Sequence, residues 1–273
     1  RKWKIKLLVH VVEWHNPDYY QGGRWGLCRW DGELQRRFVN KFTDGVICIS
    51  SHLHQYYQKH VTSVCIPPIL DFNSKRWGKV IKKTDDEKIQ VLFSGNPKRD
   101  RHRLLLEALF NVRRHHPNLS LAYIGSTRED IVGLDGVTDE LITKLADGVN
   151  FHGRVSNEMV DSIVSSASFG IICRNKAHWS DNCFPSKVPE FLGFGVPMIY
   201  NCTSDLSTYL KDGVNGIRID SLTLDSVQGA LMRVATMNAA KRKEMSRKAL
   251  DLSRCFDGSR FAEEYRILLA KVD

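Results

Sequence analysis

The 273-residue sequence lacks several patterns that would assign it to a class at once. No Gly-x-Gly-x-x-Gly follows a strand-like run, which disfavours a dinucleotide-dependent oxidoreductase. No Cys-x-x-Cys pair and no zinc-ligand spacing of Cys and His occur, so a zinc site is not indicated. No apolar run approaches the roughly 18 residues that a membrane helix needs. No signal peptide, internal repeat or low-complexity segment is visible either.

Cysteine usage and charge narrow the class further. The seven cysteines are odd in number, and Cys48, Cys65 and Cys173 lie inside apolar runs, which is typical of reduced, buried thiols in a cytoplasmic protein. The formal net charge is +9, which favours anionic partners such as phosphate-rich substrates, nucleic acid or an acidic membrane surface. Because the basic residues form no single stripe and no recognised nucleic-acid module is present, we expect no nucleic-acid partner.

Strand-like and helix-like apolar periods alternate along the chain, which is typical of an α/β fold with a parallel sheet. Early on we expect strands at 5–12, 45–50 and 64–69 and helices at 32–42 and 51–60. Later strands are expected at 91–94, 119–125, 149–153, 169–173, 198–200 and 216–219, and the last helices at 222–237, 239–253 and 259–272. The polar, lysine-rich segment 73–87 is interpreted as the linker between a domain at 1–72 and a domain at 88–273.

The most informative stretch is 182–197, where a loop runs into a short predicted helix. We expect Ser186 to cap this helix and Gly195 to end it. Lys187 and Glu190 lie three residues apart, so both point from one face of the first turn. A lysine at a helix N-terminus suits a phosphate, and a carboxylate one turn later suits a pair of sugar hydroxyls. An ordinary capped helix would explain Ser186 and Gly195, but not the lysine, the glutamate and Pro197 together.

The pattern Pro-Ser-Lys-x-x-Glu-x-x-x-x-Gly-x-Pro at 185–197 resembles the donor-binding helix of GT-B fold glycosyltransferases. It is most similar to the retaining, group 1 branch that builds bacterial capsular, exopolysaccharide and lipopolysaccharide chains. The resemblance implies a GT-B type, Rossmann-like parallel-sheet fold. It also implies a complete C-terminal nucleotide-sugar-binding domain at 88–273 and a partial N-terminal, acceptor-side domain at 1–72. The glycine-rich acceptor loop of the family does not appear, so we expect a fragment, or half of an enzyme whose other half is a separate chain.

The resemblance also implies an activity. We expect a metal-independent, retaining hexosyltransferase that uses a nucleotide-diphosphate sugar as donor substrate and no cofactor. Its acceptor would be a saccharide or a lipid-linked saccharide in cell-surface polysaccharide biosynthesis. The basic balance also suits peripheral contact with the inner face of the membrane. Two alternatives stay open: a non-catalytic nucleotide-sugar-binding half that needs a partner chain, and self-association through the truncated first domain.

Residue roles follow from matching positions of the family. Lys187 and Arg99 are expected to contact the donor diphosphate and stabilise the leaving nucleotide, with Lys98 next to Arg99 as a second candidate. Gly95, after the first strand of the second domain, would let the ligand approach the backbone. Glu190 matches the glutamate that binds the ribose.

Six further positions complete the predicted site. Asn182 stands where many relatives carry a glutamate that touches the donor sugar, so a catalytic glutamate is not expected there. Gly153 and Arg154 match a bend that packs against the nucleotide base, although Arg154 could equally be an exposed helix-entry residue. The rest of the pocket lining is expected from Phe184, Pro185 and Ser186.

The end of the first predicted strand supplies the opposite wall. Glu13 or His15 is expected to face the donor sugar across the cleft, in a catalytic role. The segment that follows is rich in aromatic residues, which either contact an acceptor sugar or fill the core of the first domain. These residues are Trp14, Tyr19, Tyr20, Trp25 and Trp30.

Overall fold

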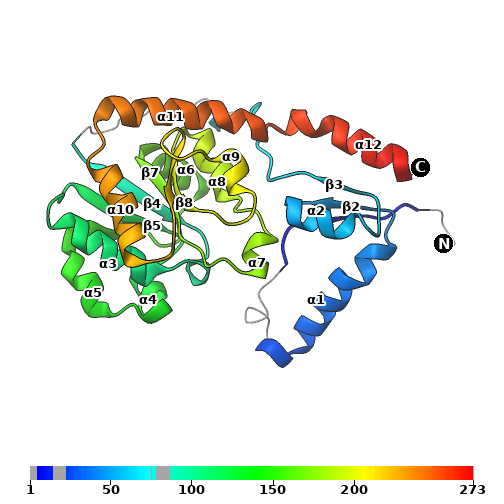
Figure 1. Ribbon diagram of the computed structural model, residues 1–273, viewed down its shortest axis with the longest axis horizontal. Helices are drawn as coiled ribbons and strands as arrows, with labels where there is room; N and C mark the ends of the chain where they lie inside the picture. Colours follow the sequence, from blue (N-terminus) through cyan, green and yellow to red (C-terminus); the bar gives the residue numbers. More distant parts are fainter. Residues whose placement is uncertain (1–4, 15–22, 75, 78–86, 273) are drawn as a thin grey trace.

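The computed structural model describes residues 5–14, 23–74, 76–77 and 87–272, apart from the side chain of Arg24. Two parallel sheets form its framework (Figure 1). The smaller sheet has the order β1-β2-β3, with strands at Leu8–Val11, Gly45–Cys48 and Ser63–Cys65. The larger sheet has the order β6-β5-β4-β7-β8-β9. Its strands are β4 (Ile89–Ser94), β5 (Leu119–Ile124), β6 (Val149–Phe151), β7 (Phe169–Ile172), β8 (Met198–Asn201) and β9 (Gly216–Ile219). The predicted parallel α/β fold is therefore confirmed.

Helices connect the strands of each sheet. In the smaller unit these are α1 (Leu27–Arg37) and α2 (Ser51–Tyr57). The larger unit holds α3 (His102–Arg113), α4 (Arg128–Ile131), α5 (Asp139–Leu145), α6 (Asn157–Ser166), α7 (His178–Asp181), α8 (Lys187–Gly193), α9 (Leu206–Tyr209) and α10 (Leu224–Ala235). The chain ends with α11 (Ala239–Ser253) and α12 (Ala262–Val272).

The larger sheet is buried on both faces because its strands are short, continuous apolar runs. One face packs against α3, α5 and α10, where Leu106, Leu109 and Leu231 are almost fully buried. The apolar cluster on the other face contains Phe191 and Val188 of α8 and continues into the smaller unit. The hydrophobic core therefore runs from one sheet to the other.

The strand order creates a switch point. Strands β4, β5 and β6 extend to one side of the larger sheet, whereas β7, β8 and β9 extend to the other, so β4 and β7 are neighbours. At such a point the loops leaving the two central strands diverge, which opens a crevice at their carboxyl ends.

The C-terminal helix returns to the smaller sheet, as the red ribbon in Figure 1 shows. Leu268 of α12 is fully buried against Ile47 and Ile66. The ammonium of Lys6 donates to the carbonyl of Val272. The last helix therefore contributes to the core of the first unit. Part of the predicted linker at 73–87 lies outside the described residues, and its boundaries stay a prediction.

Several predicted boundaries were wrong. Helix α1 begins at Leu27 and not at Gly32, and a 3₁₀ turn, Val39–Phe42, follows it. Trp30, which precedes the predicted helix at 32–42, thus lies in the helix, and Gly32 is a buried interior residue of α1. The first strand is shorter than 5–12, since only Leu8–Val11 pairs with β2. The short helices α4, α7 and α9 were missed because four residues are too few to establish a helical period.

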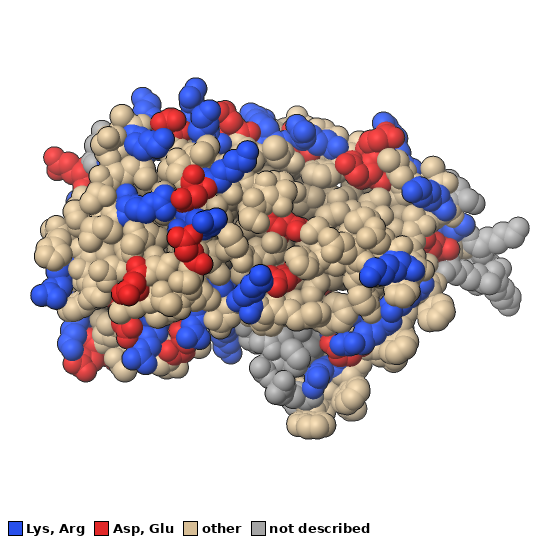
Figure 2. All heavy atoms as spheres, in the orientation of Figure 1, with Lys and Arg blue, Asp and Glu red and all other residues tan. Residues whose placement is uncertain are grey.

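Charges of both signs are interspersed over the face of the larger unit that Figure 2 shows. No helix in the described part of the chain is long and apolar enough to span a membrane.

Candidate functional site

A hollow of about 400 Å³ lies at the switch point, and we call it the switch-point hollow. Five segments line it, three from the larger unit and two from the smaller unit. The β4–α3 loop supplies Ser94, Gly95, Asn96 and Arg99, and Arg174 follows β7. The loop into α8 supplies Cys183, Phe184, Pro185, Ser186 and Lys187, and the smaller unit adds Val12, Glu13 and Ile49. The fold therefore brings together most of the residues that the sequence had suggested from separate segments.

The β4–α3 loop is held by a buried histidine. His102 Nε2 lies 2.8 Å from the carbonyl oxygen of Pro97, and its Nδ1 lies 3.2 Å from the Tyr123 hydroxyl. Because a carbonyl can only accept, Nε2 carries the proton and Nδ1 accepts from the tyrosine. Burial lowers the pKa of His102, which keeps the ring neutral. The 3₁₀ turn Pro97–Arg99 is thereby fixed at the rim of the hollow.

Arg99 connects the two units across the hollow. Its Nη2 lies 2.9 Å from Glu13 Oε2, and each side chain keeps 21% of its surface exposed. Glu13 lies two residues after β1 ends at Val11, while Arg99 ends the turn after β4. The predicted catalytic carboxylate of the first unit therefore faces the predicted phosphate ligand of the second.

A buried arginine was missed by the sequence analysis. Arg174 lines the hollow with only 10% of its side chain exposed, and its Nε lies 3.3 Å from Asp100 Oδ2. Asp100 is buried in turn and accepts from the Cys173 amide at 2.7 Å. The sequence signal was a single arginine at the end of a predicted buried strand, a position at the carboxyl edge of the sheet.

The loop into α8 differs from the prediction in one respect. Ser186 has helical backbone angles and makes no side-chain capping bond, so its expected role as a cap was wrong. The helical turn instead starts with the Val188 amide donating to the Pro185 carbonyl at 2.9 Å. The Ser186 side chain is left to line the hollow. At the other end, Gly195 has φ +66°, which suits its predicted place after the helix.

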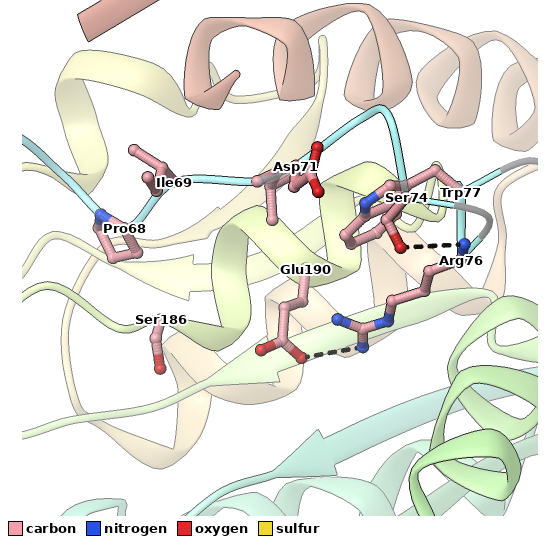
Figure 3. A pocket seen from close by; sticks show the side chains of 9 residues that line it. Pro68, Ile69, Asp71, Ser74, Arg76, Trp77, Ser186 and Glu190 are labelled. Carbon is pink, nitrogen blue, oxygen red and sulfur yellow. Dashed lines mark hydrogen bonds and ion pairs between the residues drawn. The ribbon is translucent and has the colours of Figure 1, made fainter. Parts of the chain in front are cut away.

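Lys187 and Glu190 point from one face of α8, as their spacing predicted. Lys187 Nζ lies 3.0 Å from Glu190 Oε2. Glu190 also lines a second hollow of about 300 Å³, which we call the linker hollow (Figure 3). Its other walls are Ser186 and residues of the segment after β3: Pro68, Ile69, Leu70, Asp71, Ser74, Arg76 and Trp77. Ser186 lines both hollows, so they adjoin along the start of α8.

Other predicted site residues lie outside these two hollows. The Asn182 amide is buried and donates to the His178 carbonyl at 2.7 Å, at the end of α7. Lys98 is exposed on its turn. Gly153 has φ +59° and accepts from the Gly125 amide at 2.7 Å, and Arg154 beside it is exposed. Both lie beyond the end of β6.

The aromatic residues predicted for the acceptor side differ in burial. Trp14 is buried, donates to Glu33 at 3.0 Å and packs edge-on against Tyr56 and His178, so it belongs to the core. Trp25 and Trp30 are exposed. The remaining candidates, His15, Tyr19 and Tyr20, lie outside the described residues.

Comparison with known proteins identifies the family. The family model described as "Glycosyl transferases group 1" matches residues 88–236, which is more than half of the chain. The chain belongs to the group 1 glycosyl transferases. No curated protein matches it.

Solved structures similar to this group 1 glycosyl transferase share its fold. The pneumococcal O-GlcNAc transferase GtfA, in complex with UDP and GlcNAc, is 17% identical with a TM-score of 0.66, over 98% of this chain and 52% of that one. Anabaena Alr3699/HepE, in complex with UDP and glucose, is 15% identical with a TM-score of 0.68, over 97% and 71%. Sucrose-phosphate synthase from Thermosynechococcus elongatus is 17% identical with a TM-score of 0.68, over 96% and 68%. This likeness establishes the predicted GT-B type architecture, and the chain spans about half the length of the pneumococcal enzyme.

In the described part of this group 1 glycosyl transferase, no three His, Cys, Asp or Glu side chains are grouped so that they could hold a metal ion. The charged groups that line the switch-point hollow are Glu13, Arg99, Arg174 and Lys187.

Proposed function

We propose that this chain binds a nucleotide-diphosphate sugar and transfers its hexosyl group, with retention, to a saccharide or lipid-linked acceptor. The observation that carries the proposal is the convergence of Arg99, Arg174 and Lys187 on one hollow at the switch point. Three cations around a concave site attract a diphosphate, and they stabilise the negative charge that develops on a departing nucleoside diphosphate. They would do so without a metal ion.

The solved neighbours support the nucleotide part of this proposal. The pneumococcal enzyme holds UDP and GlcNAc, and the Anabaena protein holds UDP and glucose. In this chain we place the diphosphate in the switch-point hollow and the ribose at Glu190, with the sugar beside the Arg99–Glu13 ion pair. The proposed setting is cell-surface polysaccharide biosynthesis on the cytoplasmic side of the membrane.

One observation favours a second candidate, a nucleotide-sugar-binding protein without transferase activity. The amide of Asn182, the position where the family resemblance implies a glutamate in many relatives, donates to the His178 carbonyl. An amide cannot supply negative charge to an oxocarbenium-like centre. If the chain binds the donor but neither hydrolyses it nor transfers its sugar to any acceptor, the binding role is the correct one.

Nucleotide binding is tested by thermal unfolding. We expect at least one of UDP, GDP, ADP, CDP and dTDP to raise the melting temperature by several degrees. At a ligand concentration of about 100 Kd, binding to the native state adds about 2.7 kcal/mol of stability. The matching nucleoside monophosphate should shift the melting temperature less, because it presents fewer phosphate charges to the three cations. If none of the five diphosphates shifts the transition, the proposed function is wrong.

We propose that the protein contacts the membrane through the exposed face of α1. Large apolar side chains stand exposed along 25–42: Trp25, Leu27, Trp30, Leu34, Phe38, Val39 and Phe42. Residues 27, 30, 34 and 38 follow helical spacing, so they form one stripe. The segment 27–42 contains four basic and two acidic residues, a net charge of +2. Aromatic and basic side chains on one face suit the interface of an anionic leaflet.

We expect the protein to sediment with vesicles that contain phosphatidylglycerol, and much less with pure phosphatidylcholine vesicles. Trp30→Ser and Leu34→Ser should each reduce the bound fraction several-fold because they remove apolar area from the stripe. Leu269→Ser is the matched control, since Leu269 is 48% exposed on α12 and Leu34 is 55% exposed on α1. A concentration-dependent dimer that the α1 variants dissociate, seen by light scattering, would assign the surface to a second copy instead.

A further inference from the structure

Arg76, in the segment that leads out of the smaller unit, connects two helices of the larger one. Its Nε lies 2.9 Å from each carboxylate oxygen of Asp161 on α6, and its Nη2 lies 2.7 Å from Oδ1. This two-pronged arrangement is the strong geometry for an arginine–carboxylate pair. The guanidinium is thereby anchored on α6.

The same guanidinium reaches Glu190 on α8. Arg76 Nη2 lies 3.5 Å from Glu190 Oε2, the oxygen that Lys187 also contacts at 3.0 Å. Figure 3 shows Arg76 and Glu190 approaching one another across the linker hollow, with the second oxygen of Glu190 turned away from Arg76. Because both cations use one oxygen, the carboxylate is oriented while the other oxygen remains on the side of the hollow where Ser186 lies.

Aromatic rings hold Arg76 from the remaining side. Its guanidinium carbon lies 4.8 Å from the ring centre of Trp77 and 5.4 Å from that of Phe194. Trp77 in turn lies flush against α8, since a Cβ added to Gly193 would come within 2.5 Å of the Trp77 ring. The position of Arg76 is therefore set by Asp161, Trp77 and Phe194, and Glu190 is a fourth, longer contact.

The two cations on Glu190 differ in what else they face. Of these two hollows, Arg76 lines only the linker hollow, whereas Lys187 also lines the switch-point hollow, where three cations surround the proposed diphosphate position. A diphosphate bound in the switch-point hollow would draw the Lys187 ammonium away from Glu190, because a diphosphate carries more negative charge than one carboxylate. Arg76 would stay, since Asp161 anchors it. One cation can therefore leave Glu190 while the other keeps its carboxylate in place.

We propose that Arg76 is a positioning residue for the nucleoside of the donor, and that the linker hollow receives that nucleoside. This inference rests on the proposed function. Arg76 holds the Glu190 carboxylate toward the ribose hydroxyls once Lys187 has turned to the diphosphate. The segment after β3 thus becomes part of the donor site, because its Arg76 contacts the carboxylate that would bind the ribose.

The test compares three ligands by isothermal titration calorimetry. They are the ribonucleoside diphosphate among UDP, GDP, ADP and CDP that binds the wild type most tightly, its 2′,3′-dideoxy analogue, and inorganic pyrophosphate. For the wild type we expect the ribonucleotide to bind at least about tenfold more tightly than the dideoxy analogue, since hydrogen bonds to a charged group are lost. Arg76→Ala and Glu190→Gln should each reduce this preference to threefold or less. Pyrophosphate affinity should change less than twofold in Arg76→Ala.

Further variants separate positioning from general support. In the double variant Arg76→Ala/Glu190→Gln, the loss of preference should be no greater than in either single variant, because both act on the same ribose contact. Asp161→Asn should also reduce the preference for the ribonucleotide over the dideoxy analogue, by a smaller factor than Arg76→Ala does. Arg128→Ala is the matched control, since Arg128 pairs with Asp139 at 2.8 Å away from both hollows, and it should leave all three affinities unchanged. Arg76→Gln is used in place of Arg76→Ala if the alanine variant does not fold.

Several results would overturn the inference. If Arg76→Ala keeps the full ribose preference, Arg76 has no role at the ribose. If the affinities for all three ligands fall equally, Arg76 only supports the fold. If Arg76→Ala binds the ribonucleotide more tightly than the wild type, Arg76 competes with the donor. A wild type that binds a nucleoside diphosphate without ribose preference would overturn it too, while the proposed function would survive. If the wild type binds none of the four and does not bind dTDP either, the proposed function itself fails.

Discussion

Replacement of Asp100 by alanine should lower the free energy of unfolding by about 3–5 kcal/mol, the largest effect we expect from a single substitution in this protein. Only 2% of the Asp100 side chain is exposed, and it neutralises Arg174, of which 10% is exposed. The alanine variant leaves the guanidinium buried without its carboxylate and also removes the acceptor of the Cys173 amide. Urea denaturation, with the midpoint and the slope both measured, gives the change in stability.

Companion variants identify the cause. Asp100→Asn keeps an acceptor for the Cys173 amide but loses the charge, so its cost should be smaller than that of alanine. The pair Asp100→Leu/Arg174→Met should be more stable than Asp100→Ala, because it removes both charges and leaves neither buried alone. Asp139→Ala, in the exposed pair with Arg128, should change stability little. If Asp100→Ala unfolds at the same urea concentration as the wild type, the pair does not hold the switch point together.

Replacement of Lys187 by alanine should weaken nucleoside-diphosphate binding by roughly ten- to hundredfold. A hydrogen bond to a charged group contributes about 1.5–3 kcal/mol, and each 1.4 kcal/mol is a factor of ten. The fold should be unaffected, because 39% of the Lys187 side chain is exposed and Arg76 still contacts Glu190. Isothermal titration calorimetry measures the affinity, and far-UV circular dichroism checks the fold.

The control for Lys187 is a lysine in the same local arrangement. Lys241 pairs with Glu244 three residues later at 3.1 Å, as Lys187 does with Glu190 at 3.0 Å, but it lies on α11 outside both hollows. Lys241→Ala should leave nucleotide affinity unchanged. Equal affinities for the wild type and Lys187→Ala would exclude Lys187 from the phosphate site and contradict the placement of the diphosphate in the switch-point hollow.

Much of the architecture could be predicted from local patterns of apolar and polar residues. The strands of the larger sheet were found within a few residues, because each is an apolar run bounded by polar or glycine-containing turns. The side of α8 that carries Lys187 and Glu190 was also predicted correctly, since residues three apart on a helix are neighbours by geometry alone. Errors arose where the local signal was ambiguous. The sequence pattern predicts Gly32 as the start of α1, although it lies buried in the interior of that helix, and it predicts Ser186 as a cap, although the Ser186 backbone is already helical.

The sequence by itself thus determined the fold class and the family resemblance, and it supplied those candidate site residues that stand in one continuous motif. Only the tertiary structure decided the partners of these residues. Arg174 meets Asp100 from 74 positions away, and Arg76 meets Asp161 from 85 positions away. The physical reason is that helix and strand periods depend on neighbours in the chain. Contacts between loop ends depend on strand order, and on how the two sheets pack across the switch point.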